Sequence, residues 1–173
     1  MNSATLTYGL LAGLAIAVLY AAFTDVRTRK IRNRLTLTVA LFAPAFWWAS
    51  GVSLWPGVAI QFALAAGMFL FGALMFRFRQ MGGGDVKLLT AIALWLEPDV
   101  FLTLILMICI ANGVLTVTMI ARHRRAKRAG RDVGKLQIPY AVSVAVCMLA
   151  LLAIHYGPGL QAAAGNQFNT VLT

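Results

Sequence analysis

Residues 5–34 read TLTYGLLAGLAIAVLYAAFTDVRTRKIRNR, and this stretch decides the fold class. Its first part, Thr5–Thr24, is an apolar run of 20 residues, the length that an α-helix needs to cross a bilayer. Asp25 follows, and five bases lie within the next nine residues. Because basic residues gather on the cytoplasmic side of membrane helices, the stretch predicts a transmembrane helix that ends in the cytoplasm.

The rest of the chain repeats this pattern of apolar runs and basic loops. Of its 173 residues, 61% are apolar and 12% are charged, and the mean hydropathy is +0.81. A soluble domain is about half apolar and about a quarter charged, so these values exclude a soluble domain and a disordered chain. We expect an all-α polytopic membrane protein with about six transmembrane helices, since lipid leaves no partner for an unpaired backbone group. The expected helices are Thr5–Thr24, Leu35–Val52, Trp55–Phe76, Val86–Leu96, Val100–Ala121 and Ile138–Tyr156.

All 15 Lys and Arg residues fall on one side of this arrangement. They occupy short loops at about residues 25–34, 77–87 and 122–137, whereas the other side carries only two acids, Glu97 and Asp99. The positive-inside bias therefore places the basic loops in the cytoplasm and both termini outside it. This topology, with attraction to anionic lipid headgroups, accounts for the net charge of +10, so we expect no nucleic-acid partner. Residues 1–173 are expected to form a single transmembrane domain.

The tryptophans and cysteines suggest structural roles. Cys109 and Cys147 lie inside expected helices and form no CxxC pair, so we expect ordinary buried thiols, no disulfide, and no metal or other cofactor. Every tryptophan falls near the outer end of its helix, which predicts an aromatic belt at the membrane surface. The tryptophans are Trp47, Trp48, Trp55 and Trp95.

Asp25 lies where the first expected span meets its cytoplasmic loop. Ala21 and Ala17 precede it by four and eight residues and share its helix face. Small residues on one face favour packing against neighbouring helices, so we expect Asp25 to face the bundle interior. The alternative is a simple helix-end charge at the membrane interface.

Asp85 is less ordinary, because it follows three glycines and precedes a short apolar run. The run Val86–Leu96 has eleven residues and would span about 16 Å, roughly half of a ~30 Å hydrocarbon core. We therefore expect Asp85 to lie below the inner surface, with Gly82, Gly83 and Gly84 forming an irregular approach. An ionisable residue at that depth indicates a functional site, and the alternative is a glycine hinge with a helix-capping Asp.

These residues carry a resemblance to a known family. Residues 82–88 read GGGDVKL and match the pattern GxGDxKL, and Ile31 and Asn33 follow Asp25 by six and eight residues. With the basic-inside layout, they resemble the prepilin peptidase family of GxGD membrane aspartic proteases, in particular the short forms that serve Flp/Tad-type pili. The segment Ile138-Pro139-Tyr140 also resembles the family.

The resemblance implies an enzyme and a substrate. Asp25 and Asp85 would form a catalytic dyad that activates water and hydrolyses a peptide bond without an acyl-enzyme intermediate. The substrates would be type IV or Flp-type prepilins and pseudopilins, cleaved at the cytoplasmic face of the bacterial inner membrane. The residues expected to shape the site or bind substrate are Gly82, Gly83, Gly84, Lys87, Ile31 and Asn33.

The sequence also departs from the family and leaves other functions open. Arg32 stands where the family has Pro, so the turn after Asp25 is expected to be less rigid. No CxxC motif is present, unlike in the longer relatives that also methylate, so we predict cleavage without methylation. The alternatives are a transporter component, whose carboxylates relay protons, and a non-catalytic subunit of a pilus assembly machine.

Three other polar residues near the apolar runs have simpler interpretations. We expect Lys87 to extend toward lipid phosphate or loop backbone, and Asn33 to fix the turn after Asp25. Asn112 is polar within an apolar run, and we interpret it as a packing or interhelical hydrogen-bonding residue.

Overall fold

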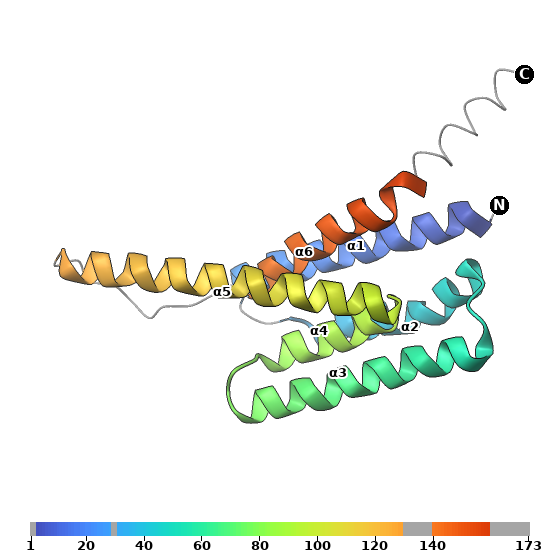
Figure 1. Cartoon of the computed structure of the whole chain (residues 1–173), viewed down its shortest axis with the longest axis horizontal. Helices are drawn as coiled ribbons and strands as arrows, with labels where there is room; N and C mark the ends of the chain where they lie inside the picture. The colour runs from blue at the N-terminus through green and yellow to red at the C-terminus, as the bar shows by residue number, and fades with distance from the viewer. Residues whose placement is uncertain (1–2, 29–30, 130–139, 160–173) are drawn as a thin grey trace, which may run out of the picture.

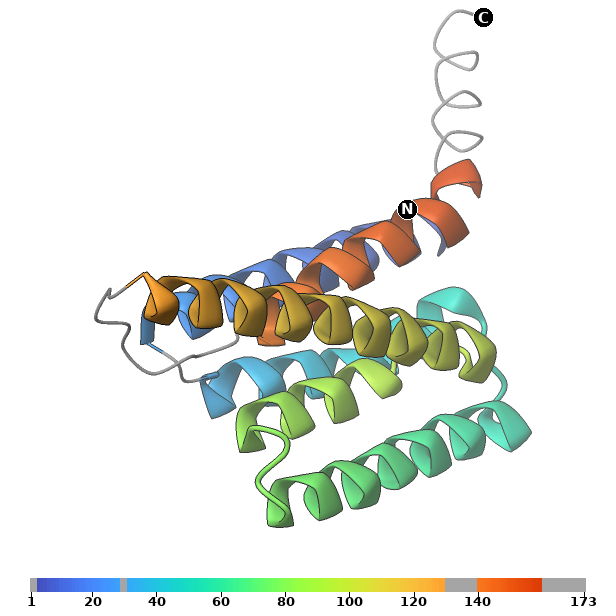
Figure 2. The same cartoon turned by 60° about the vertical axis from the view of Figure 1, so that its left-hand side comes forward.

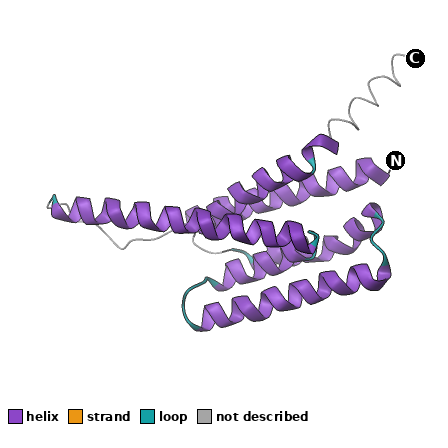
Figure 3. Cartoon of the chain, viewed as in Figure 1, coloured by secondary structure: helices purple, strands orange, loops and turns teal. Residues whose placement is uncertain are grey.

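The computed structural model describes residues 3–28, 31–129 and 140–159, and within these ranges the chain is helical with connecting turns and no strand (Figures 1 and 3). The all-α prediction is therefore confirmed. Among the residues that the structure describes, three helical stretches are long and apolar enough to cross a membrane, namely Ser3–Thr28, Leu54–Arg77 and Pro98–Arg128. The chain is a membrane protein by these lengths and compositions, and the number of crossings stays a prediction.

The elements of the described residues follow the expected apolar runs. In order they are α1 (Ser3–Thr28), α2 (Asn33–Ser50), a π-helical turn η1 (Leu54–Val58), α3 (Ala59–Arg77), α4 (Gly83–Ala93), α5 (Pro98–Arg128) and α6 (Tyr140–His155).

The helices extend further into the basic stretches than we expected. Helix α1 continues to Thr28, and α5 continues through the basic residues 122–128 instead of ending at Ala121. A helix can continue there because Arg and Lys are good helix formers and favour the negative end of the helix dipole. The remainder of the expected third loop, with Ile138 and Pro139, lies outside the described residues.

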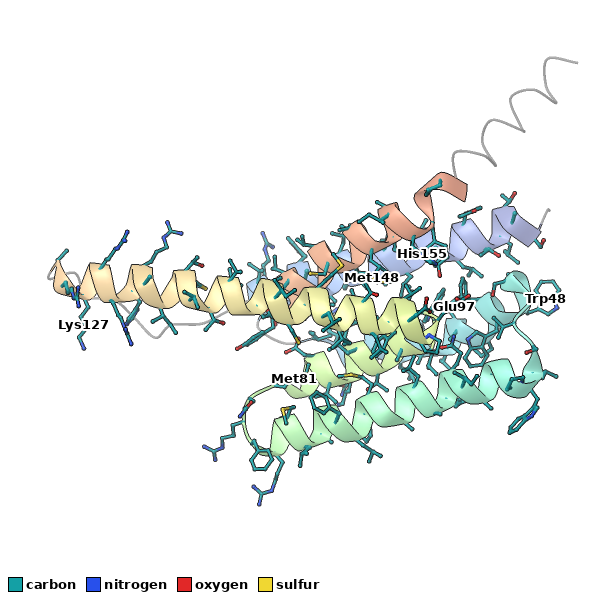
Figure 4. The ribbon with its side chains drawn as sticks, viewed as in Figure 1. Trp48, Met81, Glu97, Lys127, Met148 and His155 are labelled. Atoms are coloured by element: carbon teal, nitrogen blue, oxygen red, sulfur yellow. The ribbon has the colours of Figure 1, made fainter. Side chains whose placement is uncertain are left out.

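Successive helices run in opposite directions, so that α1, α3 and α5 point one way and α2, α4 and α6 the other (Figures 1 and 2). The labelled Lys127 lies at one end of the molecule, and Trp48, Glu97 and His155 lie toward the other (Figure 4). Tyr156, just after α6, lies close enough to Glu97 and Asp99 for their charges to act on its hydroxyl. The basic and the acidic turns thus occupy opposite ends of the bundle, as the charge pattern predicts.

Helix α4 is the centre of the bundle. Seven of its eleven residues are buried, and it packs against α2 and α3. Two tryptophans hold this region by hydrogen bonds to backbone carbonyls, since Trp95 Nε1 donates to Val39 O at 2.9 Å and Trp47 Nε1 to Leu94 O at 2.7 Å. A helix this short suits a core position, because its neighbours cover most of its surface.

The prediction of an aromatic belt holds for only two of the four tryptophans. Trp48 and Trp55 are 81% and 82% exposed, as residues at a membrane surface would be. Trp47 and Trp95 are only 7% and 3% exposed, so the belt prediction was wrong for them. Their indole N–H groups find partners inside the bundle, which lets a large apolar ring be buried there.

Apolar side chains cover the outer surface of the bundle. Phe62, Leu70 and Leu106 are each more than half exposed, on α3 and α5. A bilayer would cover such a surface, whereas a soluble protein rarely exposes contiguous apolar patches of this kind. Both cysteines are free, but only Cys147 is buried, and the expectation that Cys109 is buried was wrong.

Candidate active site

Asp85 occupies the first turn of α4 and is 9% exposed. Its carboxylate accepts a hydrogen bond from the backbone N–H of Gly82, the residue that caps the helix. This is one half of a capping box, in which the side chain of the third helical residue accepts from the N–H of the N-cap residue and stabilises the helix start. Among the described residues, Oδ1 of Asp85 has no hydrogen-bond partner. One oxygen is therefore fixed by the helix, and the other is available to a ligand or water.

The irregular glycine approach that we expected is only partly present. Gly82 is extended, with φ −72° and ψ 141°, but Gly83 and Gly84 already belong to α4. The expectation was wrong for these two residues, because the capping interaction and the packing of α4 outweigh the low helix propensity of glycine. Asp85 thus caps its helix, as the alternative predicted, and still presents a free oxygen.

Two of the glycines allow very close approaches. A methyl group on Gly82 would lie 2.7 Å from Asp85 Oδ2, so the carboxylate rests against the bare backbone. A methyl group on Gly84 would lie 3.0 Å from Cβ of Ile31, which belongs to the link between α1 and α2. The absence of side chains therefore brings Asp85 against its own cap and brings α4 against the first motif.

A hydrogen bond makes the same connection between the two motifs. Lys87 Nζ donates to Asn33 Oδ1 across 3.0 Å. Lys87 therefore has a protein partner instead of the lipid or loop-backbone partner that we expected. Asn33 is the first residue of α2, so this bond and the contact of Gly84 with Ile31 fasten the start of α2 to the start of α4.

Asp25 lies in the last turn of α1 and is half-buried. Ala21, one turn earlier, is 0% exposed, in agreement with the prediction that this face looks into the bundle. The charge of Asp25 acts on Asp85, so the two carboxylates lie within electrostatic range of each other although 60 residues separate them in the sequence. Two carboxylates that act on each other in this way are harder to ionise together than separately, and such a pair can share a proton when the two groups meet.

A cavity of about 230 Å³ opens beside Asp85 between α3, α4, α5 and α6. Asn112, Gln80 and Tyr140 line it together with Asp85. None of these three was among the predicted site residues. Asn112 carried a visible signal, a polar residue in the middle of an apolar run, but the sequence could not show which neighbour it faces.

One comparison with known proteins finds a match. The model of the type IV leader peptidase family matches residues 12–117, which is more than half of the chain. The matched region contains both carboxylates and the segments 31–33 and 82–88. No curated protein and no solved structure matches the chain.

Proposed function

Because the chain belongs to the type IV leader peptidase family, we propose that it is an aspartic endopeptidase that removes prepilin leaders at the cytoplasmic face of the inner membrane. The family indicates a peptidase with prepilin substrates. The finer assignment to the short, Flp-type enzymes is supported by residues 82–88 and by the compact, basic-inside chain. Asp25 and Asp85 are the proposed catalytic residues.

One observation carries this proposal. A nine-tenths buried carboxylate, Asp85, presents an oxygen without a partner among the described residues, and a second carboxylate, Asp25, is its charged neighbour. A carboxylate with only a structural role would be expected to have both oxygens satisfied. An orphaned oxygen beside a second acid is what a water-activating pair requires.

The chemistry needs one proton shared between the two acids. The ionised carboxylate removes a proton from water, and the water oxygen attacks the scissile carbonyl carbon. The protonated carboxyl group gives its proton to the carbonyl oxygen, which forms a neutral tetrahedral diol. Its collapse breaks the C–N bond, as one carboxyl group protonates the leaving nitrogen and the other recovers a proton from the diol. The pair acts as one unit, so base and acid are not assigned separately.

The position of the pair fits a leader peptide. Both acids belong to the end of the bundle that carries the basic residues, which the positive-inside bias puts in the cytoplasm. A substrate with a soluble leader followed by an apolar membrane helix has its junction at this level. Anionic lipid at the same face would offset part of the repulsion between this surface and a basic leader.

The test is cleavage of a co-expressed prepilin, followed by the mobility shift of its leader on a gel. We expect wild type to cleave, and Asp25→Asn and Asp85→Asn each to abolish detectable cleavage at equal membrane levels. Asp99→Asn is the matched control, because it removes an acid at the opposite end of the bundle. Cleavage that persists in both dyad variants would refute the proposed mechanism.

Asp→Glu substitutions separate the protease from a proton-relay component. A proton relay needs only a titratable group and tolerates an extra methylene. A catalytic dyad needs each carboxylate at a fixed position relative to the scissile bond. We expect Asp25→Glu and Asp85→Glu to lose cleavage as completely as the Asn variants do. Near-normal cleavage by both Glu variants would count against a dyad of fixed geometry.

A further inference from the structure

The cavity beside Asp85 is mostly apolar. Its walls come from methionine, phenylalanine and branched aliphatic side chains of four helices. They include Met68, Phe71, Met75, Ile105, Ile108 and Val144. A cavity of about 150 Å³ in another protein accepts benzene, so this one, at about 230 Å³, has room for one large apolar side chain.

Two buried side-chain oxygens without partners belong to residues that line this apolar space. They are Oδ1 of Asp85 and Oδ1 of Asn112, and neither has a hydrogen-bond partner among the described residues. Leaving a buried polar atom unsatisfied costs about 1–3 kcal/mol. Asp85 and Asn112 can therefore each offer an acceptor to a ligand that enters the cavity.

The cavity also shares lining residues with a groove near the basic end of the molecule. A wider groove of about 760 Å³ lies beside the turn between α3 and α4, and Arg77, Arg79 and Gly82 line it. Gln80, Met81 and Tyr140 line both the groove and the cavity. Met81 is labelled in Figure 4, where it lies at the turn between α3 and α4. A chain that enters from the basic end would therefore pass Gly82 and reach Asp85.

We propose that this groove and cavity bind the substrate peptide in extended form, and that Asn112 is a substrate-binding residue. The apolar side chain next to the scissile bond fills the cavity, and Asn112 Oδ1 accepts a hydrogen bond from the backbone N–H of the same segment. The inference rests on the proposed peptidase function and adds the path of its substrate.

A peptide fits the observations better than other occupants. A lipid acyl chain would fill the apolar walls but has no donor for Asn112 or Asp85. Water alone would supply hydrogen-bond donors but would leave the apolar surface of the cavity hydrated, which is unfavourable. An extended peptide presents an N–H group and a side chain within each residue, so it satisfies both at once.

The test compares Asn112→Leu, which keeps a similar shape without hydrogen-bonding atoms, with Ile110→Ala on the same helix. Ile110 is 68% exposed and does not line the cavity. With purified enzyme and a peptide that spans the leader junction, we expect KM to rise about tenfold in Asn112→Leu with kcat nearly unchanged, because the bond forms in ground and transition states alike. Ile110→Ala should keep the wild-type KM. A wild-type KM in Asn112→Leu overturns the inference while leaving the peptidase intact, whereas no cleavage by wild type overturns the proposed function itself.

A chemical experiment on the native cavity covers the case in which Asn112→Leu does not fold. Cys109 lines the cavity and is exposed, whereas Cys147 is buried. Treatment with benzyl methanethiosulfonate should place a ring in the cavity and lower kcat/KM at least tenfold. In the Cys109→Ser enzyme, kcat/KM should be the same with and without the reagent. Full activity after complete modification of Cys109 overturns the proposed path.

Discussion

Lys87 donates a hydrogen bond to Asn33 across 3.0 Å, and this contact joins two segments that lie 54 residues apart. Lys87 follows Asp85 on α4, and Asn33 begins α2 just after the link that follows α1. Together with the contact of Gly84 against Ile31, the bond fastens the start of α2 and the residue two positions before it to the start of α4. The relative position of the two acids therefore depends on groups that are not acids.

A double-mutant cycle tests this role. A hydrogen bond to a charged donor contributes about 1.5–3 kcal/mol, and the exposure of this one places it near the lower end. Lys87→Met and Asn33→Ala should each lower kcat/KM about tenfold, and the double variant should lose no more than the worse single variant. Arg34→Met, which removes a neighbouring exposed base, should change little. Additive losses in the double variant would show that the two side chains act separately.

Gly84→Ala tests the tight contact between the two motifs. The added methyl group would lie 3.0 Å from Cβ of Ile31, a branched carbon next to the backbone that has little room to move. We expect a loss of roughly 1–3 kcal/mol in stability, typical of overpacking, together with reduced cleavage.

The neighbouring substitution is the matched control. A methyl group on Gly83 would lie 3.3 Å from Cε2 of Phe76, the edge of an exposed ring that can turn aside. Gly83→Ala should therefore be the milder variant in thermal unfolding in detergent. Equal destabilisation by Gly84→Ala and Gly83→Ala would show that the contact of Gly84 with Ile31 has no special role in stability.

Gly82→Ala should have a different signature, losing much activity with only a small loss of stability. Gly82 has an extended backbone that alanine adopts without strain, but the new methyl group would lie 2.7 Å from Asp85 Oδ2. The carboxylate can swing away, which costs only the capping interaction with Gly82 and misplaces the proposed catalytic group. We expect kcat to fall at least tenfold with an unfolding temperature within a few degrees of wild type, because a misplacement of about 1 Å costs roughly a hundredfold in rate. A normal kcat in the Gly82→Ala enzyme would show that the position of Oδ2 is not critical.

Much of this arrangement was predictable from local pattern. Each apolar run became a helix because length, hydropathy and the need to satisfy the backbone agree along the run. The two acids were identifiable because ionisable residues are rare beside such runs. Both predictions use only neighbours in the sequence.

The rest depends on contacts that no local pattern specifies. The start of α4 at Gly83 contradicts glycine propensity and follows from the capping of its first turn by Asp85. The partner of Lys87 lies 54 residues away, and the face of Asn112 depends on how α5 is rotated against α3 and α6. Such relationships arise from tertiary packing, which a single sequence does not display.

Trp95→Phe tests the hydrogen bonds that hold α4 in the core. The substitution keeps most of the ring but leaves the buried carbonyl of Val39 without its donor. We expect a loss of about 1–3 kcal/mol in unfolding free energy. Trp48→Phe, at a position 81% exposed, should be nearly neutral, and equal effects of the two substitutions would contradict the core role of Trp95.

The last prediction concerns the direction in which the chain lies in the membrane, on which the cytoplasmic position of the dyad depends. In a Cys109→Ser, Cys147→Ala background, single cysteines can be introduced at Leu54, the 85% exposed first residue of η1, and at Lys127 on the basic end of α5. Because the basic end should face the cytoplasm, a membrane-impermeant maleimide should label Leu54→Cys in intact spheroplasts. Lys127→Cys should react only after permeabilisation. The reverse pattern would put Asp25 and Asp85 on the wrong side of the membrane for a substrate whose leader is cytoplasmic.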